Sequence, residues 1–534
     1  MIKTGKRILI TGQSGIKINE TLKNFCLNNL HFVRGDRPSP DLYNVEKIME
    51  RLYADSGEKL DSEMLWIEKI LSLPIPQLYI LWESAFKEIL SKIEKAPERD
   101  VIVSFHACFY HHYTIEYLSF VNSIFLLQFK PDIFITFIDD IYDIHSRLRA
   151  PNQIFNPALA GAQDSEHIIR EMRRILDWRA REIMMSRHLA NEINKTPHFC
   201  FAVKHPDETF YQLLFENKAP FYFSHPISEV RRLHRSGHEE KANNIIETIH
   251  RLEERASHEF VCFLPTTIDE YRIEFNPDNK KYSPSLTKRW DEEKYANPNG
   301  LLYIKPDKVV DNVFYIPGQK SHSGDHAGDL KNLAEHIEIQ ISSRDHKLVE
   351  QSECLFVYRP CFNGNVSRGV LKEIKYYLLL IDSLKMPKKC FIYLPHEDQN
   401  ILKINQLQLH LNNAVRQGKV KDHLKRTDDI FLNPNEIDQW ISNDENPKQC
   451  KTLLRKIITD RGLSVKLERH GLESDSSQEA MQYLNELFID YKRSVDRFIT
   501  EYRQAATKIW EEDNLSPETL INNVIQEIKK ERKQ

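Results

Sequence analysis

The sequence has no long apolar run and no excess of one charge. No stretch approaches the roughly 20 apolar residues that a membrane-spanning helix needs, so an integral membrane protein of the helical kind is not predicted. The 74 Lys and Arg residues are balanced by 78 Asp and Glu residues, and the net charge is −4. Such a chain lacks the global positive field that draws proteins to polyanions. Neither nucleic acid nor a membrane is therefore a predicted partner.

Cysteine is sparse and follows no pattern. The eight cysteines form neither a CxxC pair nor a metal-ligand spacing, which argues against a disulfide framework and against a zinc site. The first residues lead directly into a short apolar strand and lack the apolar stretch and cleavage site of a signal peptide. We therefore predict a reduced, cytoplasmic protein with no bound metal.

What the sequence does contain is an alternation of short apolar strands with helix-length segments. With 534 residues, 41% of them hydrophobic, the chain is long enough for roughly two to four domains. The predicted strands of the N-terminal part are Ile8–Thr11, Val101–Phe105, Ile133–Ile138 and Phe199–Val203. Strands separated by helices predict a parallel sheet. We assign residues 1–215 to a first α/β domain.

A second series of strands and helices begins after Lys218. Its predicted strands are Phe221–Ser224, Phe260–Leu264, Leu355–Tyr358 and Cys390–Leu394, and its predicted helices are Glu239–Arg255, Leu330–Ile341 and Arg368–Ser383. The stretch 276–328 is rich in Pro, Asn, Asp, Lys and Gly, which predicts an insertion rather than core. We assign residues 216–430 to a second α/β domain with a parallel sheet.

No strand is predicted beyond about residue 430. From Met481 to Ile509, apolar residues recur at alternating steps of three and four, which is typical of a coiled-coil seam or of one long helix packed on another. Two interpretations stay open: a contact between subunits of a homo-oligomer, or docking of the helix on its own chain. We assign residues 431–534 to a helical C-terminal region.

A glycine-containing loop follows the first predicted strand. The segment from Gly12 to Asn19 stands between a strand and a helix, which is the context in which a Walker A loop holds phosphates. The second glycine, the lysine and the Ser/Thr of that motif are replaced by Lys17, Ile18 and Asn19. The candidate nucleotide-binding residues are Gly12, Ser14, Gly15 and Lys17. ATP with Mg²⁺ is a candidate cofactor of this domain, although the residues that hold it in the motif are replaced.

The first domain resembles the P-loop nucleoside and adenylate kinases over roughly residues 5–205. Val101–Ala107 matches their strand that ends near the substrate, and Ile133–Asp140 with Ile144–Arg149 matches their next strand and arginine-bearing lid. The resemblance implies a nucleotide-binding fold. Kinase activity, a degenerate role in sensing a nucleotide and a purely structural role are the alternatives that it leaves open.

Three segments of the second domain carry candidate catalytic and binding residues. The first follows a strand and supplies Ser224, His225, Ser228 and Arg231; the second holds Asp345, predicted to open a short helix; the third runs from Ser367 to Glu373. We expect them to converge at the carboxyl edge of a parallel sheet. Two carboxylates about 5 Å apart can attack an anomeric carbon and transfer the proton, as in retaining glycosidases. Glu373 and Asp345 are the predicted pair.

The predicted helix start in the third segment has the features of an anion site. Gly369 lets the backbone approach a ligand closely, and the first N–H groups of a helix favour a negative group. Ser367 adds a hydroxyl donor, and Val370 follows at the same edge. A phosphorylated substrate is therefore predicted.

These segments resemble the nucleoside 2-deoxyribosyltransferase superfamily, and most of all its 2′-deoxynucleoside 5′-phosphate N-hydrolase branch. The match covers roughly residues 219–400 and rests on Asp345 ahead of a strand, followed by Ser367-Arg-Gly-Val-Leu-Lys-Glu373. Together with the kinase resemblance of the first domain, it implies two Rossmann-like domains in the chain. It also implies Glu373 as nucleophile, Asp345 as its acid/base or positioning partner and Ser367 as a phosphate contact. Ser367 replaces the Asp usual in the transferases, which favours the hydrolase branch.

The predicted function is hydrolysis or exchange of the N-glycosidic bond of a nucleotide or nucleoside, with no cofactor required. Regulation by the first domain and a role in antiviral nucleotide depletion are hypotheses from this architecture. The alternatives are an NAD glycohydrolase, a non-catalytic nucleotide-binding protein and a nucleotide kinase. The resemblance also implies a homo-oligomer, to which the C-terminal helices are the candidate contact.

Overall fold

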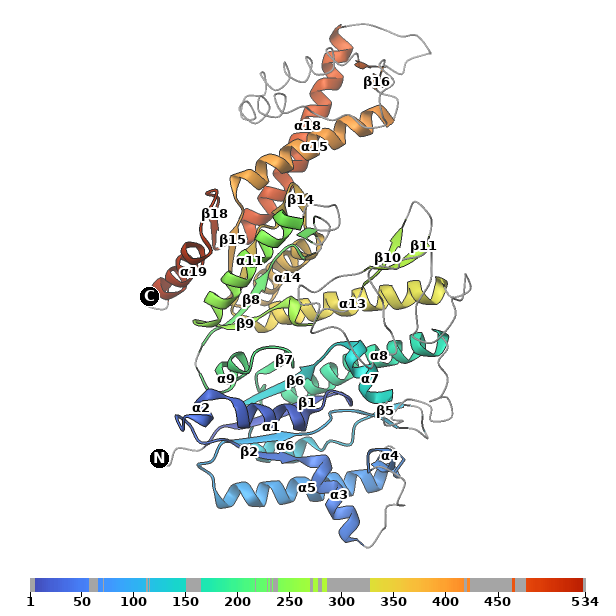
Figure 1. Cartoon of the computed structure of the whole chain (residues 1–534), viewed down its shortest axis with the longest axis vertical. Coiled ribbons are helices and arrows are strands. Elements are labelled where there is room, and N and C mark those ends of the chain that lie inside the picture. Colours follow the sequence, from blue (N-terminus) through green and yellow to red (C-terminus); the bar gives the residue numbers. More distant parts are fainter. Residues whose placement is uncertain are drawn as a thin grey trace. The chain divides into compact units, whose positions relative to one another are not determined.

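The chain folds into two compact units and contains two parallel sheets flanked by helices (Figure 1). The first sheet belongs to unit 1; the second belongs to unit 2 except for its edge strand at Val261–Phe263, which is part of unit 1. The computed structural model describes residues 5–56, 66–70, 72–111, 114, 116–149, 165–216, 218–227, 229–230, 233, 239–268, 272–276, 281–285, 327–416, 420–422, 463–465 and 477–531. Unit 1 comprises Met1–Pro220 and Phe260–Gln351, and unit 2 comprises Phe221–Glu259 and Ser352–Gln534. Both units are therefore built from segments that are distant in the sequence.

The sheet of unit 1 has the strand order β2-β3-β1-β6-β7, and every neighbouring pair is parallel. The strands are β1 (Arg7–Gly12), β2 (Asp41–Asn44), β3 (Val101–Ser104), β6 (Ile133–Ile138) and β7 (His198–Ala202). The central strands are nearly continuous runs of buried apolar residues, as expected where helices cover both faces. The four strands predicted from the sequence are confirmed; β2, with its half-buried residues, is an addition.

Helices cover both faces of this sheet. The helices of unit 1 are α1 (Ile18–Asn28), α2 (Leu30–Val33), α3 (Val45–Asp55), α4 (Trp66–Ile70), α5 (Ile75–Lys95), α6 (Ser123–Phe129), α7 (Ile141–Arg149), α8 (Ser165–Glu192), α9 (Asp207–Phe215) and α13 (Ala327–Gln351). On one face, Leu9 of β1 shares a buried cluster with Trp82 of α5 and Leu189 of α8. On the other, Phe210 of α9 contacts Phe137 of β6, with ring centroids 5.3 Å apart. Two hairpins, β4 (Phe109–His111) with β5 (Glu116–Leu118) and β10 (Arg272–Asn276) with β11 (Lys281–Ser285), complete the unit.

The second sheet has the order β18-β15-β12-β8-β9. Its strands are β8 (Pro220–Ser224), β9 (Val261–Phe263), β12 (Cys354–Tyr358), β15 (Lys389–Tyr393) and β18 (Lys508–Trp510), and β12 is parallel to both β8 and β15. The first strand along the chain, β8, lies between the second and the third. The direction in which strands are added therefore reverses between β8 and β12.

Helices and short hairpins complete unit 2. Its helices are α11 (Glu239–Ser257), α14 (Arg368–Leu384), α15 (His396–Arg416), α18 (Ser477–Ala505) and α19 (Pro517–Glu531). The hairpins pair β13 (Cys361–Phe362) with β14 (Asn365–Val366) and β16 (Val420–Asp422) with β17 (Leu463–Val465). All four strands predicted between Phe221 and Leu394 are confirmed, and so are the helices at Glu239–Arg255 and Arg368–Ser383.

Two predictions about the second half of the chain were wrong. Strands do occur beyond residue 430: β18 pairs in parallel with β15 and forms an edge of the sheet. Its three residues are too few to show a periodicity. Asp345 does not open a short helix, because it lies within α13, which runs unbroken for 25 residues. No proline or glycine interrupts that helix near Asp345, so it continues to the strand. The units also differ from the predicted domains at 215/216 and 430/431, since α13 belongs to unit 1.

Four residues of the predicted apolar seam are buried within their own chain. Tyr491, Val495, Tyr502 and Ala505 of α18 are each at most 5% exposed, and α18 packs against α15 and α14. These residues support the interpretation that the helix docks on its own chain. Ile509, the last residue of the predicted seam, lies in β18 instead.

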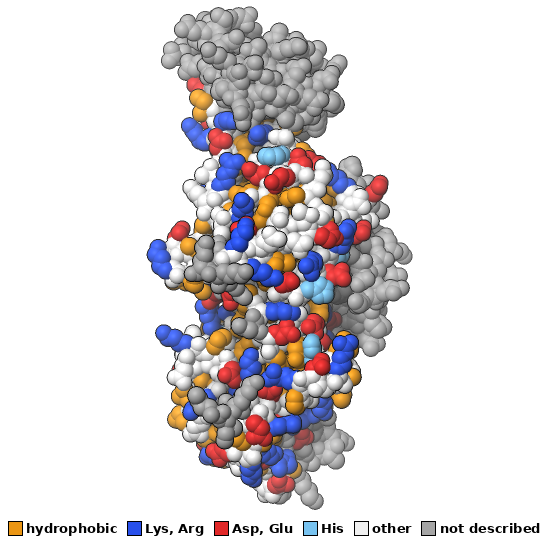
Figure 2. All heavy atoms as spheres, turned by 90° about the vertical axis from the view of Figure 1, so that its left-hand side faces the viewer, with side chains coloured by type: hydrophobic (Ala, Val, Ile, Leu, Met, Phe, Trp, Pro, Cys, Tyr) orange, Lys and Arg blue, Asp and Glu red, His pale blue; other side chains and the backbone are white. Residues whose placement is uncertain are grey.

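The surface of the described residues carries both charges in a mixed pattern. Figure 2 shows Lys and Arg side chains interspersed with Asp and Glu side chains over the visible face. This agrees with the near balance of charges in the sequence. Among the described residues, no helix is long and apolar enough to cross a membrane.

Candidate functional site

The strongest candidate site in unit 2 centres on a carboxylate inside a buried apolar stripe. The buried residues of α14 are Val370, Glu373, Ile374, Tyr377 and Leu380, which recur at the helical spacing and form one face. Glu373 is the charged member of this face and is 7% exposed. A carboxylate rarely stands in such a stripe unless polar partners compensate its burial. The structure supplies those partners from the neighbouring strand.

Two hydroxyl groups of β8 hold the carboxylate of Glu373. The phenol of Tyr222 donates a hydrogen bond of 2.9 Å to Oε1, and the hydroxyl of Ser224 donates to Oε2. Both donors are fully buried. Because they are two residues apart on a strand, their side chains project to the same face. These two hydrogen bonds fix the orientation of the Glu373 carboxyl group.

The first turn of α14 lies on the same helix as Glu373. Ser367 is the N-cap; its side chain is buried and makes no capping hydrogen bond, whereas its backbone N–H donates to Pro360 O at 3.0 Å. A Cβ added at Gly369 would meet nothing within 4 Å. Uncapped N–H groups beside open space suit the approach of an anion. Val370 is 2% exposed, so it packs in the core.

A tight hairpin fixes the approach to this helix. Asn363 and Gly364 have φ angles of 50° and 69°, as the two central residues of a type I′ turn require. A Cβ at Gly364 would collide with Asn405 and Ile401 of α15. The sequence Phe362-Asn-Gly-Asn365 is itself a strong hairpin signal, and our sequence analysis missed it.

A buried ion pair anchors the same hairpin. Arg359, which follows β12, donates through Nε to Asp398 Oδ2 at 2.6 Å and through a terminal nitrogen to Oδ1 at 2.8 Å. The backbone N–H of Asn363 also donates to Oδ1, at 3.1 Å. Asp398 is fully buried. Next to this pair, burial raises the pKa of Tyr358 to about 12, so its phenol stays protonated at neutral pH. The sequence gives no sign of this ion pair, because Arg359 and Asp398 are 39 residues apart.

The structure brings together some of the predicted site residues and separates others. Ser224 contacts Glu373, whereas the ring of His225 lies 5.5 Å from that of Phe223, which occupies the opposite side of β8. Asp345 belongs to unit 1, where its Oδ1 accepts from Arg344 at 3.0 Å. The pairing of the two carboxylates therefore stays a prediction. Ser228 and Arg231 lie outside the described residues.

In unit 1, the predicted loop joins β1 to α1. Gly12 ends β1, and its N–H donates at 3.1 Å to the fully buried carboxylate of Glu182. Glu182 also accepts from Ala107 N and Cys108 N at 2.8 and 2.9 Å. Burial raises the pKa of Glu182, and the charge of His106 and the N–H groups of Ala107 and Cys108 oppose that rise. Through these hydrogen bonds, Glu182 links α8 to the carboxyl ends of the central strands.

Lys17 has a different role from the lysine of a Walker A loop. It is the N-cap of α1 with a φ of 58°, a left-handed conformation in which glycine is usual. Its ammonium pairs with Glu20 at 3.1 Å and is half exposed. Ser14 is buried, and the backbone of Gly15 has a φ of 91°.

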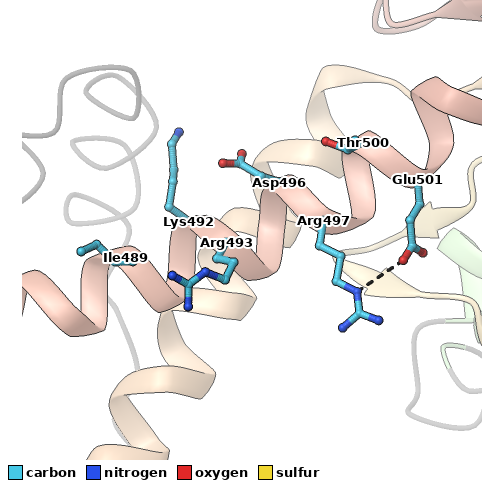
Figure 3. Close-up of a pocket in the computed structure, with 7 residues that line it drawn as sticks. All are labelled: Ile489, Lys492, Arg493, Asp496, Arg497, Thr500 and Glu501. Atoms are coloured by element: carbon cyan, nitrogen blue, oxygen red, sulfur yellow. Dashed lines mark hydrogen bonds and ion pairs between the residues drawn. The ribbon is translucent and has the colours of Figure 1, made fainter.

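Two further features of the structure do not have the properties of a ligand site. His31, Glu208 and Glu216 place ligand atoms within 4.8 Å of one another, but Lys218 already balances Glu216 at 2.9 Å. A hollow of about 630 Å³ follows α18 (Figure 3), lined by the charged side chains of Lys492, Arg493, Asp496, Arg497 and Glu501 besides Ile489 and Thr500. Its charges nearly cancel, and Glu373 is not part of it.

No protein-family model matches the chain, and no curated protein matches it. Function is therefore inferred from the side chains and the topology described above.

Proposed function

We propose that unit 2 cleaves the N-glycosidic bond of a nucleotide or nucleoside and that Glu373 is the nucleophile. The observation that carries this proposal is the buried carboxylate of Glu373, held on both oxygens by Tyr222 and Ser224. Both hydroxyls lie near the carboxyl end of β8, beside β12. This is the point where the strand order reverses, and doubly wound sheets bind their ligands there.

The chemistry needs only groups of the kind that the site holds. The carboxylate attacks C1′ of the sugar as the bond to the base breaks, and a glycosyl ester of Glu373 forms. The departing base takes up a proton from solvent water or from the acid/base group proposed at Asp345, and the water that attacks in the next step gives one proton back. Water then cleaves the ester, so the sugar is released with a hydroxyl at C1′ and the carboxylate is regenerated. The proposed role of Asp345 as proton donor stays a prediction.

The first turn of α14 supports a phosphorylated substrate. Its N–H groups, the Ser367 hydroxyl and the open space beside Gly369 lie on the helix that carries Glu373. An anion is favoured at such a helix start. A nucleoside 5′-monophosphate therefore suits the site better than a free nucleoside.

Chromatographic detection of free base tests the proposal directly. Purified protein is incubated with ribo- and deoxynucleoside monophosphates, nucleosides, triphosphates and NAD. Release of a nucleobase supports the proposal, and release of nicotinamide alone would assign an NAD glycohydrolase instead. If no base is released from any substrate, with or without ATP, the proposed glycosidase is refuted for the isolated protein.

Tyr222→Phe is expected to slow base release by about 10- to 100-fold, because a carboxylate that loses the hydrogen bond from this phenol is less well oriented for attack. The loss is expected in kcat, since the phenol contacts the proposed nucleophile. Tyr117→Phe is a matched control, because that phenol donates to Arg174 O in unit 1. An unchanged kcat in Tyr222→Phe would remove the positioning role.

Gly369→Ala is expected to raise KM for a nucleoside monophosphate by about tenfold, because the added methyl group occupies the open space where the phosphate is proposed to lie. Stability should stay the same or rise by about 0.5–1 kcal/mol, since alanine is favoured over glycine in helices. Steady-state kinetics and thermal unfolding measure the two effects. An unchanged KM would place the phosphate elsewhere.

A further inference from the structure

One edge of the unit 1 sheet carries a side chain in the place of a further strand. β7 ends the strand order of this sheet, and β6 is its only strand partner among the described residues. The N–H of Cys200 in β7 donates to Gln351 Oε1 at 2.9 Å, and Gln351 Nε2 donates to Cys200 O at 3.0 Å. One carboxamide therefore pairs with both backbone groups of Cys200, as the peptide groups of an adjacent strand would. We call this contact the edge cap.

The edge cap lies on the side of β7 that faces away from β6. Val203 N donates to Ile138 O of β6 at 3.0 Å. Successive residues of a strand direct their backbone groups to opposite edges, so Cys200 and Ala202 face the outer edge. The carbonyl of Ala202 is occupied as well, because it accepts from the N–H and from Nδ1 of His205, both at 3.0 Å. Both outward positions are thus paired with groups of the same chain.

The sequence of β7 makes an open edge hazardous. Residues 198–203 read His-Phe-Cys-Phe-Ala-Val and contain no Asp, Glu, Lys, Arg, Pro or Gly. Burial lowers the pKa of His198 to about 3, so its ring is neutral at physiological pH. Short, uncharged, apolar segments pair with copies of themselves when their edge is exposed. The outer edge of β7 is therefore a surface that suits a second copy of the same strand.

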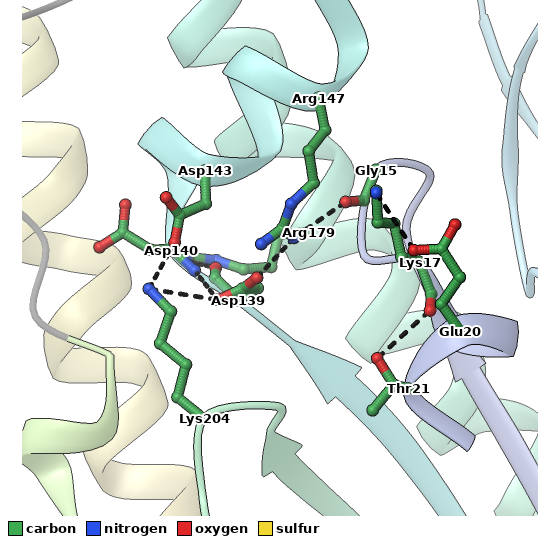
Figure 4. Close-up of polar contacts among 10 residues, drawn as sticks. All are labelled: Gly15, Lys17, Glu20, Thr21, Asp139, Asp140, Asp143, Arg147, Arg179 and Lys204. Atoms are coloured by element: carbon green, nitrogen blue, oxygen red, sulfur yellow. Dashed lines mark hydrogen bonds and ion pairs between the residues drawn. The ribbon is translucent and has the colours of Figure 1, made fainter. Parts of the chain in front are cut away.

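The residues that flank β7 limit its length on both sides. Pro197, which has no N–H, precedes the strand. Lys204 follows it, and its ammonium lies 2.5 Å from Asp143 Oδ2 (Figure 4). Proline and charged residues at the ends of a strand restrict the pairing of another chain. The middle of the strand lies between them, and this is where Gln351 pairs with Cys200.

The opposite edge strand, β2, is protected by charge instead. Its four residues are all half-buried. Asp41 pairs with Arg99 at 2.5 Å, and the ammonium of Lys92 lies 5.6 Å from the ring centroid of Tyr43. Charged side chains on an edge strand oppose the addition of another strand. β7 contains no charged residue, so the edge cap takes that role.

The edge cap is part of the last turn of a helix. Gln351 is the final residue of α13, and the chain leaves unit 1 directly after it. Arg187 of α8 donates to Glu350 Oε1 at 2.6 Å, and Lys347 Nζ lies 3.9 Å from the same atom. These ion pairs hold the end of α13, yet helix ends open at a lower free energy than a sheet does. The edge of β7 can therefore be uncovered while the sheet stays folded.

We propose that the outer edge of β7 is a latent surface for self-association, to which a second copy of the chain adds its own β7, and that Gln351 keeps this surface closed. Two copies of the strand fit each other because neither places a charge opposite the other. The inference goes beyond the proposed reaction of unit 2 and does not depend on it.

Hydrogen exchange of the full-length protein tests the edge cap itself. In dilute Gln351→Ala, the amide of Cys200 is expected to exchange about tenfold faster than in the wild type, because its acceptor is lost. The amide of Phe201, which faces β6, should stay protected and so shows that the sheet is intact. Unchanged exchange at Cys200 would refute the edge cap. Loss of protection at Phe201 would show that Gln351 supports the fold instead.

Light scattering over a range of protein concentrations tests the self-association. Gln351→Ala is expected to form assemblies of at least twice the wild-type mass. Gln351→Glu keeps an acceptor for the Cys200 N–H and adds a negative charge at the edge, so it should retain the wild-type mass. Gln504→Ala is the control, since Gln504 is an exposed glutamine of α18. Wild-type mass in Gln351→Ala, or equal association of Gln351→Glu, would overturn the proposal.

Discussion

Glu373→Gln is expected to lower the rate of base release by about 10³-fold or more, because an amide cannot form the glycosyl ester. The variant should still fold. Glutamine keeps the shape of the side chain and retains an oxygen that accepts from Tyr222 or Ser224. The measurement is the rate of base release under single-turnover conditions, together with the thermal unfolding temperature.

Asp382→Asn is the matched control for this experiment. Asp382 is an exposed carboxylate on the same helix, so its loss should change neither rate nor stability by a measurable amount. Base release at the wild-type rate in Glu373→Gln would exclude Glu373 as the nucleophile. A loss of rate with a large fall in unfolding temperature would instead show that Glu373 has a structural role.

Asp398→Asn is expected to have the largest effect on stability. The change leaves Arg359, whose side chain is 13% exposed, without its buried counter-charge. Breaking a buried pair from one side costs about 3–5 kcal/mol, which lowers the unfolding temperature of a unit of this size by roughly 10 °C. Calorimetry of the full-length protein measures this shift.

Glu397→Gln provides the comparison, because it removes the neighbouring charge of Arg359. Glu397 is half exposed and lies 3.5 Å from the guanidinium, so its loss should cost less than about 1 kcal/mol. Equal effects of the two variants would contradict the assignment of Asp398 as the anchor. The Asp398 variant should also weaken catalysis, since the hairpin that it holds leads directly to Ser367.

Local patterns predicted the regular elements of both sheets. The strands from Ile8, Ile133 and Leu355 are short apolar runs between polar segments, and burial on both faces of a parallel sheet produces that pattern. Three-residue β18 could not be predicted this way. Its place at the sheet edge comes from pairing with β15, which lies more than a hundred residues earlier.

The site was predicted in part. The sequence motif marks Glu373 as a carboxylate near the start of the helix that follows a strand, and Ser224 as the end of a strand. It does not reveal Tyr222 as a donor, because that residue lies 151 positions away and also reads as an ordinary apolar strand residue. Asp345 was placed by motif order alone. Tertiary structure assigns it to unit 1, where Arg344 is its neighbour.

Because both units are discontinuous in sequence, the order of synthesis and the effect of proteolysis differ from those of a protein with two consecutive domains. The chain passes from one unit to the other three times, at residues 220/221, 259/260 and 351/352. During synthesis, unit 1 cannot fold completely until residue 351 has been made. At that stage residues 221–259 of unit 2 already exist, whereas residues 352–534 of the same unit do not. No single cleavage of the backbone yields both units whole. Neither unit can therefore be produced whole from one continuous stretch of the chain.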